Sequence, residues 1–197
     1  MRMLRCLLMI VAVGFVGAET LADRLQAAAQ DVRTLRLPFV QTKVIALFDE
    51  TVTTPGVVEI DRQAGALRWE FTGRSTFILN RGRLRKWGAD GGEEVGLDRD
   101  PNLAALKAQM QAMLSGDWAG IEDRFATAYT DDPPAVTLTP RDAVLQRYLD
   151  SIRIVFRTDL SAPAALELHA EGGDRTDYAF AEPVLNEAIE ASRFSGP

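Results

Sequence analysis

The chain has 197 residues, of which 47% are hydrophobic, and a formal net charge of −6. This length suits one domain with a substantial core. The negative charge excludes the usual nucleic-acid binders and proteins that adhere to anionic membrane surfaces, because both surfaces repel an acidic chain. It would suit a basic partner, although the need for solubility explains it equally well.

The first residues have the pattern of a secretory signal peptide. A short region with two arginines precedes an apolar stretch from Leu4 to Val16, and Ala18 is suited to the position before a cleavage site. The apolar stretch is too short for a spanning helix. We therefore expect residues 1–18 to be removed, which leaves a single domain, 19–197, in the periplasm. An uncleaved membrane anchor is the alternative.

The only cysteine of the chain, Cys6, lies within this expected signal peptide. The mature chain then has no disulfide and no thiol chemistry. Cys6 also lies too early to be the lipidated cysteine of a lipoprotein. We expect the mature protein not to be tethered to a membrane.

A helix is predicted from Thr20 to Val32, because its apolar residues form one stripe at spacings of three and four. Thr20 and Asp23 resemble a capping box at its start.

Short strands follow this helix. Leu37 to Phe48 is predicted as a strand that starts or lies at an edge because of Pro38. In the stretch from Leu67 to Thr72, apolar and polar residues alternate, which is typical of a strand with one buried face. Other strands are expected over 57–61, 76–80 and 84–87, with a hairpin turn at Asn80-Arg81-Gly82.

The pattern then changes to a helix that Asp100-Pro101 begins and Gly116 ends. Its apolar residues recur at spacings of three and four, and two of them are methionines, which adapt to irregular or mobile partners. They are Leu103, Leu106, Met110 and Met113. This helix looks like a cover over one face of the sheet, although an ordinary amphipathic helix on a core has the same pattern.

Strands return at 125–130, 136–139, 152–156, 166–170 and 176–180, joined by turns rich in Gly, Pro and Asp. The sequence therefore predicts one mainly β domain with helices (α+β), and its strands are mostly antiparallel.

Candidates for catalysis are few. His169 is the only histidine and lies between Glu167 and Glu171 on the polar side of a predicted strand. A hydrolase would need further partners, and a metal site would need more ligands. The carboxylate pairs fall in turns, and no glycine-rich loop suited to phosphate opens a helix. We expect no enzyme activity, no metal and no cofactor.

Taken in order, these pieces resemble the periplasmic outer-membrane lipoprotein carrier family (LolA). The resemblance rests on the first helix and the residues Phe39, Gln41, Arg62, Trp69, Gly82 and Trp87, the inserted helix, Leu138-Thr139-Pro140, and Phe194 near the end. It implies an incomplete, strongly curved antiparallel β-barrel closed by a helical lid, which holds acyl chains and has no cofactor.

The implied partners are an acylated lipoprotein or other lipid cargo, an inner-membrane donor and an outer-membrane acceptor. Nucleic acid is not among them, and we expect a monomer. The resemblance also implies that Arg62 latches the lid, although Gln63 replaces the proline usual after it, and Arg68 is the rival. The residues expected to line the cavity and lid are Phe39, Trp69, Phe71, Leu103, Leu106, Met110 and Met113.

Several alternatives stay open. The aromatic stripe could simply fill a core. A divergent relative could carry a glycolipid or a polyene-type acyl product instead of lipoproteins. A module that senses mislocalised lipid or lipoprotein could share the fold, but no second domain or extension for a partner is visible in the sequence.

Overall fold

The computed structural model describes residues 19–48, 50–88, 91–94, 101–117, 121 and 123–196. The expected signal peptide, residues 1–18, lies outside the described residues. Within the described part, neither α-helix has the length and apolar character needed to cross a bilayer.

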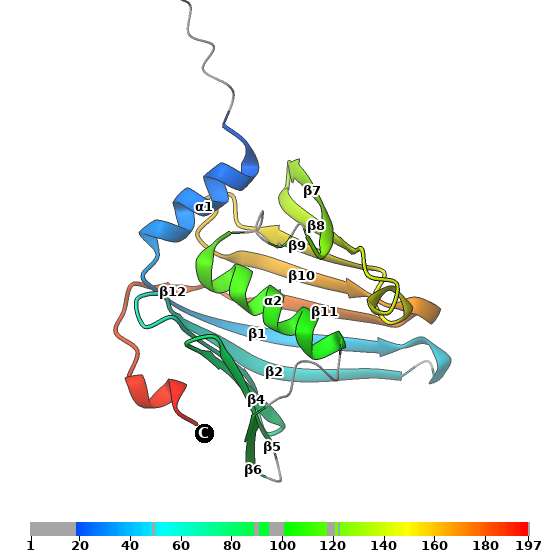
Figure 1. Cartoon of the computed structure of the whole chain (residues 1–197), viewed down its shortest axis with the longest axis horizontal. Helices are drawn as coiled ribbons and strands as arrows, with labels where there is room; N and C mark the ends of the chain where they lie inside the picture. The colour runs from blue at the N-terminus through cyan, green and yellow to red at the C-terminus, as the bar shows by residue number, and fades with distance from the viewer. Residues whose placement is uncertain are drawn as a thin grey trace, which may run out of the picture.

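One antiparallel sheet dominates the structure (Figure 1). Its strands are β1 (Thr34–Ile45), β2 (Glu50–Asp61), β3 (Ala66–Phe71), β4 (Ser75–Asn80), β5 (Arg83–Gly88), β6 (Gly91–Glu94), β7 (Phe125–Asp131), β8 (Pro134–Pro140), β9 (Ser151–Phe156), β10 (Pro163–His169), β11 (Arg175–Phe180) and β12 (Val184–Leu185). They follow the order β6-β5-β4-β3-β2-β1-β11-β10-β9-β8-β7, and β12 pairs with β1. Among the described residues β6 and β7 do not pair with each other, so the sheet is curved but open. The predicted fold class is confirmed, because the chain is mainly β with helices and its curved antiparallel sheet is incomplete as a barrel.

In the described part of the chain, two α-helices and four short 3₁₀ segments accompany the sheet. They are α1 (Leu21–Asp31), α2 (Pro101–Ser115), η1 (Ala46–Phe48), η3 (Leu145–Arg147), η4 (Glu171–Gly173) and η5 (Ala191–Phe194). The predicted capping box is present, since Asp23 N donates to Thr20 Oγ1 and Thr20 N donates to Asp23 Oδ2. Gly116, at φ +75°, ends α2 against Ala29 of α1, where a Cβ would lie 2.2 Å from the Ala29 Cβ.

The two faces of the sheet are covered by different segments. Helix α2 lies across one face, called here the inner face (Figure 1), and a large apolar core fills the space beneath it. The segment with η5 covers the outer face of β3 and β4, where Phe194 packs on Ala66 and Ile78. Strand β3 is therefore buried on both faces, although its sequence alternates like that of a half-exposed strand.

Two strands differ from the sequence-based expectation. β1 begins at Thr34, so Pro38 lies inside a central strand and not at its start or at an edge. The carbonyl of Pro38 accepts from Ala181 N, on the side where the partner of β1 changes from β12 to β11. The missing N–H of Pro38 faces the same side, so no ladder hydrogen bond is lost there. β2 is also longer than predicted, because it pairs with β1 along its whole length.

Gly56 permits the close approach of an aromatic side chain. It lies opposite Phe39 in β1 and Phe71 in β3, and a Cβ on it would lie 2.2 Å from both the Phe39 ring and the carbonyl oxygen of Glu70. We expect Gly56→Ala to displace Phe39 and to lower the free energy of unfolding by about 1–3 kcal/mol, as overpacking does. Urea denaturation measures this. Gly88→Ala is the matched control, because its Cβ would meet nothing closer than 3.9 Å. Equal denaturation midpoints for the two variants would contradict the prediction.

Candidate functional site

Aromatic side chains gather at the centre of the inner face. Phe39 lies between the rings of Trp69, Phe71 and Tyr178, with centroid distances of 6.1, 5.5 and 5.3 Å and edge-on geometry. The strand register explains the cluster, because β1 pairs with β11 and with β2, which in turn pairs with β3. Edge-on contacts between aromatic rings are favourable beyond the area they bury. The cluster forms an apolar floor beneath α2.

A cavity of about 480 Å³ adjoins this floor. It lies between α2 and the inner face, and its lining is mostly apolar. The lining residues are Lys43, Trp69, Phe71, Phe77, Leu106, Gln109, Leu145, Tyr148, Leu149, Ile152, Leu166, Leu168, Ala170, Asp174, Thr176 and Tyr178. Apolar cavities of this size commonly hold small ligands.

The residues predicted to line the site divide into two groups. The structure brings Trp69, Phe71 and Leu106 together around the cavity. Phe39 and Met110 do not line it, because both are packed in the core, with 3% and 0% of their surface exposed. Met113 lies nearer the other end of α2, beside a small void of about 30 Å³.

The side chain of Leu103 lies outside the described residues, although its backbone belongs to α2. The sequence reasoning missed the far wall of the cavity, which β9, β10 and β11 provide through Ile152, Leu166 and Tyr178. Apolar residues recur at every second position in those strands, which indicates one apolar face. This pattern did not show that these residues lie opposite α2.

Polar groups are confined to a few places around the cavity. Gln41 Nε2 donates to the Tyr178 hydroxyl at 2.7 Å, and burial raises the pKa of Tyr178 to about 12, so this phenol stays neutral. Asp174 accepts from the backbone N–H of Ala46, at the hairpin end of the long strands. Lys43 is exposed. The charged members of the lining are Lys43 and Asp174, while most of the wall is apolar.

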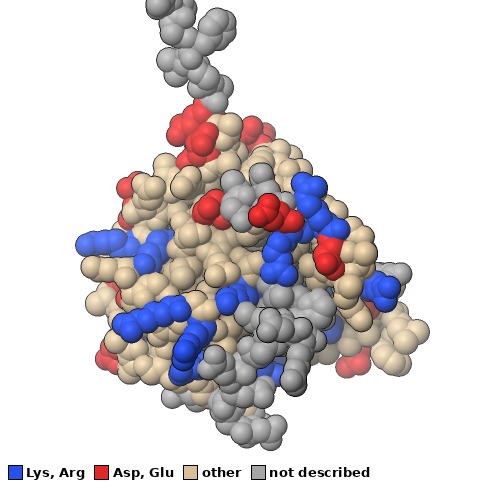
Figure 2. Space-filling model, in the orientation of Figure 1, with Lys and Arg blue, Asp and Glu red and all other residues tan. Residues whose placement is uncertain are grey.

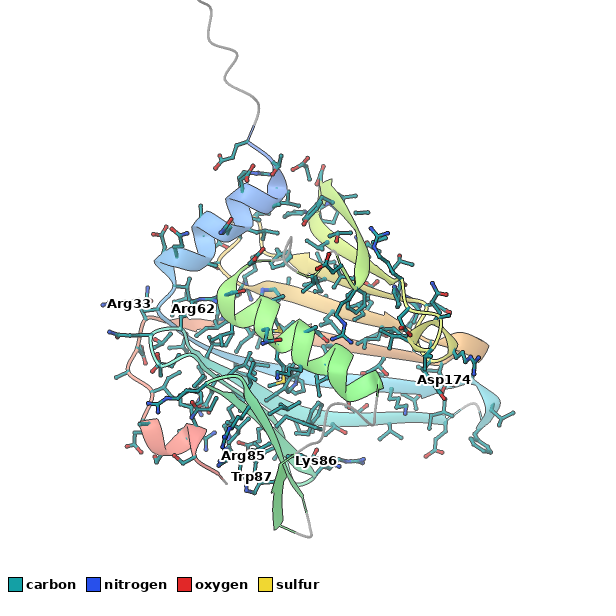
Figure 3. All side chains as sticks on the ribbon, viewed as in Figure 1. Arg33, Arg62, Arg85, Lys86, Trp87 and Asp174 are labelled. Carbon is teal, nitrogen blue, oxygen red and sulfur yellow. The ribbon has the colours of Figure 1, made fainter. Side chains whose placement is uncertain are left out.

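Arg62 lies at the opposite end of α2 from Asp174 (Figure 3). Its Nε donates to the Val32 carbonyl at 2.9 Å, and its Nη1 donates to the carbonyls of Met113 at 2.8 Å and of Leu114. Burial lowers the pKa of Arg62, and these carbonyls compensate for the water that the guanidinium has lost. One side chain therefore joins β2, the end of α1 and the last turn of α2.

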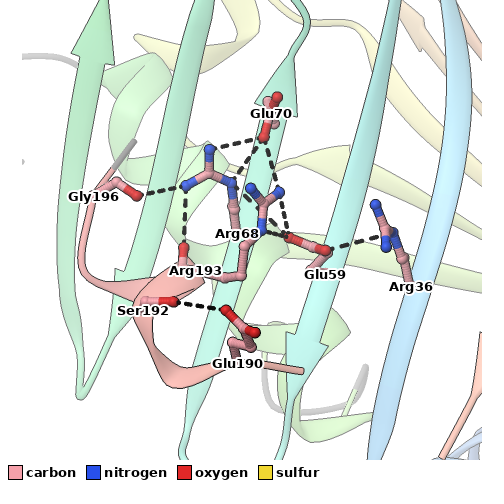
Figure 4. A network of polar contacts seen from close by, with 8 residues as sticks. All are labelled: Arg36, Glu59, Arg68, Glu70, Glu190, Ser192, Arg193 and Gly196. Atoms are coloured by element: carbon pink, nitrogen blue, oxygen red, sulfur yellow. Dashed lines mark hydrogen bonds and ion pairs between the residues drawn. The ribbon is translucent and has the colours of Figure 1, made fainter. Parts of the chain in front are cut away.

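Arg68 makes a different set of contacts, on the outer face (Figure 4). It donates to Glu70 Oε2 at 2.8 and 2.9 Å and to the carbonyls of Arg193 and Gly196. Arg193 in turn pairs with the buried Glu59 at 2.8 Å. Burial tends to raise the pKa of Glu70, but Arg68 and Arg193 hold it below its usual value. Arg68 thus anchors the C-terminal segment and does not reach α2.

Charge is unevenly distributed on the face that carries α2 (Figure 2). Lys and Arg side chains are prominent at the left, the lower left and the upper right of this view, acidic side chains lie at the top and beside the basic group at the upper right, and uncharged surface extends between them. Among the described side chains, no group of three or more His, Cys, Asp and Glu is placed to hold a metal ion. What the site offers is an apolar enclosure beneath a helix.

Sequence comparison assigns the central part of the chain. Residues 73–163 match a family described as outer membrane lipoprotein carrier protein LolA-like. That segment is LolA-like. A curated outer-membrane lipoprotein carrier protein from Halorhodospira halophila is 36% identical over 91 residues, which are 46% of this chain and 41% of that protein. The match thus spans less than half of the curated relative.

Solved structures extend the comparison to the fold. A DUF1329 family protein from Desulfovibrio piger matches with a TM-score of 0.50 and 7% identity, covering 88% of this chain and 94% of that one. A putative outer membrane lipoprotein-sorting protein domain from Vibrio parahaemolyticus matches with a TM-score of 0.48 and 8% identity, with the same coverage. At these identities the first likeness shows a shared fold alone.

The resemblance stated from the sequence is confirmed over residues 73–163, which are less than half of the chain. The LolA-like segment contains β4 to β9 and α2, together with Gly82 and Trp87. Phe39, Arg62 and Trp69 lie before it. The description of this family as a carrier agrees with the expectation that the chain is not an enzyme.

Proposed function

We propose that this protein carries acyl chains in the cavity beneath α2. The observation that carries the proposal is the mostly apolar cavity of about 480 Å³ between a helix and an aromatic floor. Burial of each CH₂ group contributes about 0.8 kcal/mol, so such a cavity holds an acyl chain that water would reject. The LolA-like match and the curated carrier relative support this assignment.

We further propose that α2 acts as the lid and that Arg62 latches its C-terminal end. The cavity is lined by Leu106 and Gln109 of α2, which precede the residues bound by Arg62. Opening of the lid then requires the hydrogen bonds from Arg62 to the carbonyls of Met113 and Leu114 to break. Release requires that the closed state be only marginally favoured, because a tightly closed lid would retain its cargo.

The wider biological setting belongs to the same proposal. Residues 1–18 are a signal peptide that directs the chain to the periplasm, and 19–197 form one carrier domain. The cargo is an acylated lipoprotein or a related lipid, received from an inner-membrane donor and delivered to an outer-membrane acceptor by a monomeric protein without a cofactor. The pattern of the first residues and the curated relative support this setting.

Fluorescence quenching tests the cavity directly. With Trp87→Phe and Trp118→Phe, Trp69 is the one tryptophan left of the three in the chain. We expect dibromostearic acid to quench its emission strongly and to saturate at one ligand per protein, because bromine quenches on contact and Trp69 lines the cavity. Stearic acid, which lacks bromine, is the control. Quenching no greater than that by dissolved bromide ion would refute the carrier proposal.

A further inference from the structure

The cavity has room for an acyl chain. A methylene group, like a water molecule in the liquid, takes up about 30 Å³, which is small beside the cavity volume of about 480 Å³.

One end of the cavity carries a cation. Phe39, Gln41 and Lys43 alternate along β1, and side chains at such spacing lie on the same face of a strand. The inner face thus changes along β1 from aromatic to amide to ammonium. Lys43 lies opposite Thr176, which also lines the cavity. Among the described residues Lys43 has no ion pair, either with Asp174 or with any other carboxylate, so its charge is available to a ligand.

Two buried donors in the cavity wall lack acceptors. Trp69 Nε1 and Gln109 Nε2 have no hydrogen-bond partner among the described residues, although only 2% and 5% of these side chains are exposed. A buried donor without an acceptor lowers stability, so it usually indicates a missing partner. Both residues line the cavity. Together with Lys43, the cavity lining therefore contains hydrogen-bond donors that have no acceptor. A ligand with oxygen acceptors would pair with them.

We infer that the cavity selects an acyl amphiphile with an anionic head group, a carboxylate or a phosphate, which pairs with Lys43. This inference rests on the proposed carrier function. The acyl chain lies against Trp69 and Phe71, and its head group lies at the hairpin end of the long strands. Asp174 also lines this end of the cavity, but its carboxylate already accepts from Ala46 N, whereas Lys43 has no ion pair among the described residues. A cationic head group would meet the charge of Lys43 and bring donors where acceptors are needed, so we expect it to bind more weakly than an anionic one.

The test compares ligands with the same chain and different heads. Palmitic acid and hexadecanol displace a fluorescent acyl probe from the protein, at a pH where the acid is ionised. We expect the acid to bind about fivefold more tightly, which is the effect of an exposed ion pair. Lys43→Gln should abolish this preference and leave hexadecanol binding unchanged. Lys107→Gln, which removes a lysine of α2 outside the lining, should keep the preference. Lysophosphatidic acid with a palmitoyl chain then distinguishes phosphate from carboxylate recognition.

Each outcome decides a different statement. If neither palmitic acid nor hexadecanol displaces the probe, the carrier proposal itself fails. If both bind equally to the unmodified protein, the carrier proposal stands and the inference about the head group is overturned. The inference is equally overturned if Lys43→Gln keeps the preference for the acid.

Discussion

Replacing Met110 with aspartate is expected to abolish ligand retention while the sheet stays folded. Met110 is fully buried between α2 and the inner face. An unpaired carboxylate there costs several kcal/mol, and the helix escapes this cost by lifting so that the charge reaches water. The strands keep their hydrogen bonds to each other when α2 lifts, because each pairs only with neighbouring strands.

The measurement has two parts. Acyl-probe binding should be lost, while amide hydrogen exchange in β1, β2 and β11 should stay slow. Gln111→Asp is the matched control, because Gln111 is exposed on the same helix and its replacement should change neither quantity. Global loss of protection in Met110→Asp would show that α2 is an integral part of the core, and the role of α2 as a lid would have to be abandoned.

Replacing Arg62 with leucine is expected to speed ligand release about tenfold and to change the free energy of unfolding much less. The variant removes the hydrogen bonds to the carbonyls of Val32, Met113 and Leu114. Each bond to a charged group contributes about 1.5–3 kcal/mol, but water takes over part of this at a half-buried site. The apolar leucine would stand beside a small void that Leu25 and Ile60 also line. The substitution therefore destabilises mainly the closed position of α2.

Stopped-flow dissociation of an acyl probe measures this rate. Arg33→Leu is a suitable control, since Arg33 is exposed and lies close to Arg62 in Figure 3, and its guanidinium is not among the groups that bind α2. We expect the control to release ligand at the original rate. An unchanged rate in Arg62→Leu would remove the latch from the proposed mechanism.

Local patterns were enough to predict most elements of the fold. The capping box of α1, the turn at Arg81 and Gly82, and the end of α2 at Gly116 depend on neighbouring residues, and all three are present. The predicted position of Pro38 within its strand was wrong, because that prediction also used only neighbouring residues. Its missing N–H is harmless only because β11 and β12 exchange places beside it, and those strands lie far away in the sequence.

The candidate site was harder to predict, because periodicity identifies a face but not what covers it. Met110 and Leu106 share one stripe of α2, yet one fills the core and the other lines the cavity. The sequence also did not show which of Arg62 and Arg68 contacts the helix. They are distinguished by the C-terminal segment, which returns to cover Arg68 through Arg193 and Gly196, leaving Arg62 with α2.

The acceptors of Arg62 are all main-chain carbonyls, and this has a consequence for how such a protein diverges. The Arg62 latch requires only that a helix ends at the position of Met113 and Leu114, whichever side chains those residues carry. Substitutions along α2 can therefore reshape the space offered to a ligand without weakening the closure. During evolution, cargo specificity can therefore change by single substitutions in α2 while the Arg62 latch is retained.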